Sequence, residues 1–164
     1  MKASAGPRLA AKREEIMIRA WLAAFMLLLA PPVLAQPGSA PTIPQSFLIQ
    51  PAELAATLKL GPKPVILQVG FKVMYDEARI PGALYAGPAG KDDGIAVLKT
   101  VAASIDTSQE VILYCGCCPW EHCPNVAAAW RTLKELGFTN LKVLYIPKNF
   151  GADWVEKGYP VVKG

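Results

Sequence analysis

The chain has 164 residues, of which 52% are hydrophobic, and its 17 basic and 13 acidic side chains give a net charge of +4. Residues 1–35 hold five of the basic and two of the acidic side chains, so the rest of the chain carries 12 and 11, a net charge of +1. This near balance excludes the strongly basic proteins that bind nucleic acids or anionic membrane surfaces. We therefore expect no nucleic-acid partner.

The first 35 residues have the pattern of a secretory signal peptide. Basic residues precede an apolar run over residues 20–29, and Val33-Leu34-Ala35 offers small residues for cleavage. The run is shorter than the roughly 20 apolar residues that a membrane span requires. Met1 and Met17 both remain candidate starts, because the segment from Met17 makes a complete signal by itself. We expect a periplasmic or secreted protein with no membrane attachment after cleavage.

A stretch rich in Pro, Gly and Ser follows the signal, and no internal repeat is visible. We predict a flexible linker over residues 36–48 and one folded domain over residues 49–164. The part that remains after cleavage has the length of a single domain with one core.

Short apolar strands alternate with helices along the predicted domain. The helix at 125–136 is the clearest, and Gly137 follows it as a left-handed cap. This alternation is typical of an α/β domain with a mostly parallel sheet and helices on both faces. In chain order we expect a helix at 51–58, strands at 64–69 and 84–86, a helix at 94–103, a strand at 110–114, the helix at 125–136, a strand at 141–145, a short helix at 149–157 and a closing segment at 159–162.

All four cysteines of the chain lie within nine residues, directly after the strand at 110–114. They are Cys115, Cys117, Cys118 and Cys123, and the single histidine, His122, lies among them. In parallel sheets, ligands bind outside the carboxyl ends of the strands. The cysteine loop is therefore the candidate functional site.

Four further segments stand out in order along the chain: Ile80-Pro81-Gly82-Ala83, Val111 to Cys115, Ala127 to Gly137 and Trp154 to Val161. Together and in this order they resemble the rhodanese-like family. They match its turn after the first strand, the strand that ends on the active cysteine, the following helix with its glycine stop, and the closing segment. The resemblance implies a three-layer rhodanese-like domain and a sulfurtransferase that carries a sulfane sulfur as a cysteine persulfide.

The chain also departs from the family pattern. Gln68-Val69-Gly70 stands where the family usually has Asp-Val-Arg, and the loop is longer and contains no Lys or Arg. Counted from the strand, Cys115 matches the catalytic residue, whereas Cys118 matches when counted back from the helix. We favour Cys115, because the strand end fixes where the nucleophile enters the loop.

Sulfur transfer requires a thiolate, whose pKa falls near a helix N-terminus or a cation. An anionic donor also needs a positive charge, which Arg79, Lys148 or protonated His122 could supply, although Arg79 and Lys148 could also be solvated surface charges. Trp120 could line the mouth of the loop or pack against its base, and we favour packing. We expect as partners a small sulfur-containing anion or a thiol acceptor protein, and a monomeric enzyme that needs no cofactor.

Other chemistries stay open for the same loop. Cys117, Cys118 or Cys123 could resolve a persulfide as a disulfide, or the loop could exchange disulfides with a partner. Cys115, Cys117, Cys118 and Cys123 with His122 would also suit Cu or Zn. A disulfide-stapled loop on a catalytically inactive rhodanese-like binding domain is the remaining alternative.

Overall fold

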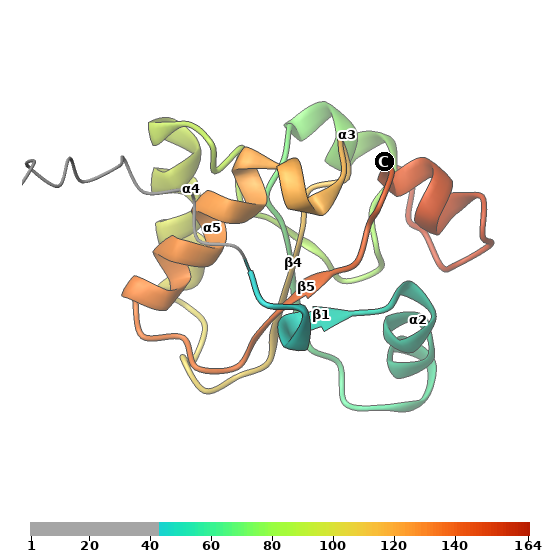
Figure 1. Ribbon diagram of the computed structural model, residues 1–164, viewed down its shortest axis with the longest axis horizontal. Helices are drawn as coiled ribbons and strands as arrows, with labels where there is room; N and C mark the ends of the chain where they lie inside the picture. The colour runs from blue at the N-terminus through green and yellow to red at the C-terminus, as the bar shows by residue number, and fades with distance from the viewer. Residues whose placement is uncertain (1–42) are drawn as a thin grey trace, which may run out of the picture. The chain divides into compact units, whose positions relative to one another are not determined.

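The computed structural model describes residues 43–164, which form a five-stranded sheet (Figure 1). The strand order is β1-β5-β4-β2-β3, and every neighbouring pair of strands is parallel. This confirms the predicted parallel α/β architecture. The strands are β1 (Leu48–Ile49), β2 (Val65–Gln68), β3 (Leu84–Tyr85), β4 (Val111–Tyr114) and β5 (Leu141–Leu144).

The helices agree with the predicted ones to within a few residues, apart from one short helix and two short helical turns that were not predicted. The short helix α3 (Lys72–Glu77) was not predicted. The remaining helices are α2 (Pro51–Leu60), α4 (Asp92–Ala102) and α5 (Pro124–Glu135), with the short helical turns η1 (Gln45–Phe47) and η2 (Trp120–His122) and the π-helical turn η3 (Gly151–Val155).

The two faces of the sheet are buried in two separate hydrophobic clusters. Successive side chains of a strand point to opposite faces, so Leu113 lies in the cluster that α4 and α5 cover, while Ile112 lies in the other cluster. That second cluster is covered by α2 and by the C-terminal segment around Trp154. The expected helices on both faces of the sheet are thus present, and β4 lies between two other strands with both faces buried.

The folded part begins earlier than residue 49. Ile43 is only 5% exposed, η1 follows, and Leu48 and Ile49 pair with Val143 and Leu144 of β5. The last residues of the predicted linker therefore belong to the fold. The predicted signal peptide and the rest of the linker lie outside the described residues. Within residues 43–164, no helix has the length and apolar character needed to cross a membrane.

Replacing Leu113 with alanine should destabilise the domain by about 2–5 kcal/mol, because the side chain is fully buried and its loss leaves a cavity. Denaturant unfolding of the purified domain measures this change. Leu60, at the end of α2, is 91% exposed, and Leu60→Ala is the matched control that should change stability little. Equal effects of the two substitutions would contradict the central place of β4.

Candidate functional site

Cys115 lies directly after β4, and its side chain is 3% exposed. The chain turns sharply at the next residue, because Gly116 has a positive φ of 96°. A Cβ atom at this glycine would lie 2.9 Å from the Cβ of Phe150. Both the conformation and the close approach therefore require glycine here.

Two backbone hydrogen bonds tie the cysteine loop to the segment after β5. The amide of Phe150 donates to the carbonyl of Gly116 over 3.0 Å, and the amide of Trp120 donates to the carbonyl of Ile146 over 2.9 Å. These bonds fix the loop on both sides of Cys117.

The sulfur of Cys115 receives hydrogen bonds from three elements of the site. Nδ2 of Asn125, in the first turn of α5, lies 3.4 Å from Sγ, while Oδ1 of the same side chain accepts the amide of Gly90 over 2.8 Å. The Cys117 thiol lies 3.2 Å from the same sulfur, and the sulfur of Cys123 lies within 4.8 Å of it. The donors replace the cation that the loop lacks.

These contacts favour the thiolate of Cys115. The hydrogen bond from Cys123 is the main cause that lowers the pKa of Cys115 to about 6, against the opposing effect of burial. The pKa of Cys123 is raised in turn, because its proton is shared with that thiolate and it is buried. Partial removal from water and hydrogen bonds with Cys118 and Cys115 raise the pKa of Cys117 to about 12. One thiolate, Cys115, beside two protonated thiols, Cys117 and Cys123, is the charge state that follows.

Gln68 and Gly70 hold the other side of Cys115. Gln68 is 1% exposed; its Nε2 donates to the carbonyl of Cys115 over 3.2 Å, and its Oε1 accepts the amide of Gly70. A Cβ at Gly70 would lie 2.8 Å from Cys115 Sγ. The glycine is thus required by the sulfur beside it.

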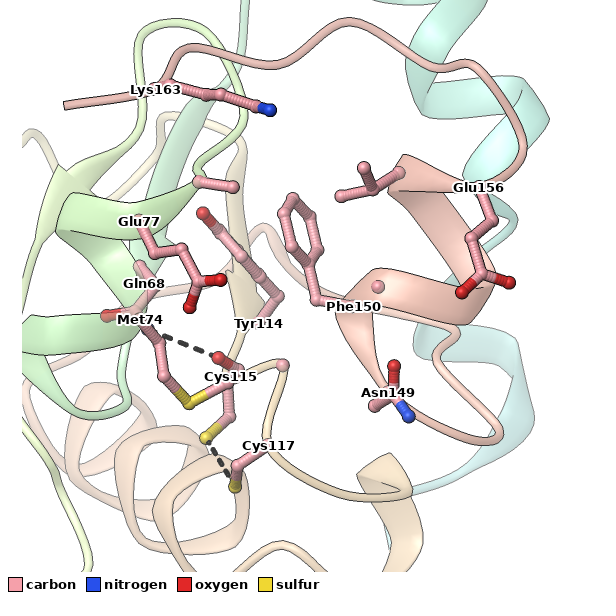
Figure 2. Close-up of a pocket in the computed structure, with 14 residues that line it drawn as sticks. Gln68, Met74, Glu77, Tyr114, Cys115, Cys117, Asn149, Phe150, Glu156 and Lys163 are labelled. Atoms are coloured by element: carbon pink, nitrogen blue, oxygen red, sulfur yellow. Dashed lines mark hydrogen bonds between the residues drawn. The ribbon is translucent and has the colours of Figure 1, made fainter.

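A cavity of about 480 Å³ opens beside Cys115, between α3, the cysteine loop and the C-terminal segment (Figure 2). Its wall is partly apolar, with Met74, Tyr114 and Phe150 among its side chains. Its charged lining residues are two carboxylates, Glu77 and Glu156, and one ammonium group, Lys163. The full lining is Gln68, Met74, Glu77, Ala78, Tyr114, Cys115, Gly116, Cys117, Asn149, Phe150, Gly151, Val155, Glu156 and Lys163.

The same chain fold occurs in solved structures. The rhodanese-like domain of a protein from Anabaena matches with a TM-score of 0.54 and 22% identity, over 72% of this chain and 80% of that one. The domain has the rhodanese-like fold. A rhodanese-related protein from Thermoplasma volcanium matches with a TM-score of 0.51 and 22% identity, over 71% and 97% of the two chains. The polysulfide-sulfur transferase of Wolinella succinogenes matches with a TM-score of 0.50 and 16% identity, over 71% and 78%.

Comparison of the sequence alone gave less. No family model matches this chain, and no curated protein matches it.

The fold brings together only some of the predicted site residues. Cys115 and Cys117 line the cavity, while Cys118 is half-buried and lies outside its lining. Trp120 is 7% exposed and packs in the core. This favours a packing role for its side chain over a place at the mouth of the cavity. His122 is exposed on η2 and does not line the cavity either.

The two predicted cations lie elsewhere. The Arg79 guanidinium stacks over the ring of Tyr75 at 4.7 Å and donates to the carbonyl of that residue. Lys148 is exposed, and its amide donates to the carboxylate of Asp153. Neither lines the cavity, so the expected positive charge beside the sulfur is not supplied by either residue.

The thiols could also hold a metal. The sulfur atoms of Cys115, Cys117 and Cys123 all lie within 4.8 Å of one another. Three thiols at this spacing suit soft ions such as Cu(I), or Zn(II) with a further ligand. Cys118 and His122, which the sequence added to this set, are not part of the group.

Several site residues were missed by sequence reasoning. Gln68 and Gly70 were visible as departures from the family pattern, and a polar Gln at the end of a buried strand was the available signal. Asn125 was visible only as the start of a helix. No sequence pattern pointed to Glu77 or Lys163 as site residues. Glu77 lies on α3, which was not predicted, and the C-terminus with Lys163 approaches the site only through tertiary packing.

The alkylation rate of Cys115 by iodoacetamide should rise with pH to half its maximum at about 6, because the thiolate reacts and the site lowers its pKa. Tandem mass spectrometry of the labelled peptide assigns the modified cysteine. Cys123→Ala removes the main hydrogen bond to the sulfur and should move the midpoint to higher pH, whereas Cys118→Ser should leave it in place. A wild-type midpoint at the ordinary thiol value of about 8.5 would contradict the site as described.

Proposed function

We propose that the protein is a sulfurtransferase that carries a sulfane sulfur as a persulfide on Cys115. One observation supports this most strongly: a buried cysteine sulfur at the end of the central strand faces a cavity and receives several hydrogen bonds. The rhodanese-like fold adds to the case, because one protein that shares it is a polysulfide-sulfur transferase.

The first step needs only the Cys115 thiolate and a donor. The thiolate attacks the sulfane sulfur of the donor, a new S–S bond forms on Cys115, and the donor's own S–S bond breaks. The electron pair of that bond leaves with the remaining part of the donor, as a thiolate or as sulfite. In the second step an acceptor thiolate attacks the outer sulfur and restores the Cys115 thiolate.

The hydrogen bonds around Cys115 Sγ serve both steps. Donors aimed at the sulfur stabilise its negative charge before the attack and again when the acceptor has taken the outer sulfur. Asn125 is held for this purpose from its other end, because Gly90 donates to its Oδ1.

The charges of the cavity indicate the donor. Glu77 and Glu156 repel a dianion such as thiosulfate, and Lys163 offsets only one of them. An organic persulfide carries at most one negative charge on its sulfur, and the apolar wall suits its organic group. We therefore propose organic persulfides as donors rather than the small dianion.

Sulfur transfer from an organic persulfide to cyanide should yield thiocyanate, and Cys115→Ser should lower this rate by about a hundredfold or more, because it removes the nucleophile. Cys118→Ser is the matched control and should keep the wild-type rate. Loss of the rate in Cys118→Ser but not in Cys115→Ser would assign the role to Cys118. A wild-type rate equal to the uncatalysed one would end the proposal.

Glu77→Gln should raise the rate with thiosulfate by roughly threefold or more at low ionic strength, because it removes a repelling charge from the cavity. The rate with an organic persulfide should change less. Glu135→Gln makes the same change of charge on an exposed residue of α5, away from the cavity, and serves as the control. Equal rates for both donors in the wild type would contradict the proposed donor class.

A further inference from the structure

We propose that Cys117 resolves the persulfide on Cys115, forming a Cys115–Cys117 disulfide and releasing hydrosulfide. The inference rests on the proposed function and adds the fate of the sulfur. The domain would then reduce the persulfide to hydrosulfide as well as carry its sulfur. An external thiol would reopen the disulfide.

The geometry of the two thiols carries this inference. Sγ of Cys117 lies 3.2 Å from Sγ of Cys115 (Figure 2), about 1 Å more than a disulfide bond. One residue separates them, and its positive φ turns the chain so that both side chains lie on the same side. Gly116 is also the residue whose Cβ would collide with Phe150, so the turn is fixed from outside the loop.

The step is balanced within the site. The Cys117 sulfur attacks the inner sulfur of the persulfide, Cys115 Sγ, and the bond between the two persulfide sulfurs breaks. The proton of the Cys117 thiol moves to the outer sulfur, which leaves as hydrosulfide. Two cysteine sulfurs are oxidised to the disulfide, and the sulfane sulfur is reduced to the sulfide level. No oxidant is required, and two equivalents of an external thiol, or one dithiol, reset the pair.

The Cys117 side chain is both close to Cys115 and open to an external thiol. Its sulfur points toward Cys115 although the residue as a whole is exposed.

The other two cysteines fit the role less well. Cys118 has its sulfur 3.2 Å from Cys117 and does not line the cavity. Cys123 is 1% exposed, and its carbonyl accepts a hydrogen bond from Ala127 in the first turn of α5. A disulfide to Cys123 would be closed to an external thiol. The exposed Cys117 leaves the disulfide open to attack.

A single-turnover experiment on the fully reduced protein tests the inference. Anaerobic protein is mixed with one equivalent of an organic persulfide, without cyanide or other thiols, and is desalted before intact-mass analysis and sulfide assay. The wild type should lose the mass of two hydrogen atoms and release stoichiometric sulfide. Cys117→Ser should gain the mass of one sulfur atom and release only the blank level. Glu135→Gln, on an exposed residue of α5 away from the cavity, should behave as the wild type, and protein without donor should keep its reduced mass.

The other outcomes overturn the inference in distinguishable ways. A wild-type protein that keeps the added sulfur and releases none would show a carrier without resolution. Sulfide release that survives in Cys117→Ser but is lost in Cys123→Ser would assign the step to Cys123. A Cys117→Ser protein that carries the donor's organic group would show simple disulfide exchange. Proteins that neither change mass nor form thiocyanate from the same donor would end the proposed function together with this inference.

Discussion

The site depends on one constraint, which is that a thiolate is buried where the cavity beside it offers little positive charge. A buried charge is costly unless hydrogen bonds or opposite charges compensate for it. Cys115 is 3% exposed, and its compensation comes from the amide of Cys117, the side chain of Asn125 and the thiol of Cys123. Each donor needs its own fixed place, which explains why the loop, the start of α5 and the segment after β5 are joined by hydrogen bonds.

The same constraint explains the unusual residues around the sulfur. Gly70 occupies a place where a Cβ would touch Cys115 Sγ, and Gln68 uses both ends of its amide to hold Cys115 and Gly70 together. Gly116 lets the chain leave β4 at an angle that places a second thiol against the first. Cys117 and Cys123 are thus part of the support of the thiolate, and Cys117 is also placed for chemistry on it.

The sequence was sufficient for the fold, because strands such as Val111–Tyr114 are apolar runs and α5 has clear apolar spacing and a glycine stop. It was sufficient for the position of Cys115, which depends only on the end of a strand. The sequence did not predict the position of the Arg79 side chain, which was expected at the site and instead stacks on Tyr75. The direction of a side chain depends on its tertiary neighbours, which the sequence does not give. α3 was missed since Lys72–Glu77 is short and has no buried residue. The signal peptide stays a prediction, because it lies outside residues 43–164.

The claim that Cys115 carries the sulfur has a direct structural test. A crystal structure of Cys117→Ser, treated with an organic persulfide before freezing, removes the proposed resolving thiol and should trap the loaded state. We expect one additional sulfur atom bonded to Cys115 Sγ, within reach of Asn125 Nδ2 and facing the cavity. An additional atom on Cys118 or Cys123, or an unmodified Cys115 in crystals whose protein has gained a sulfur by mass, would contradict this account.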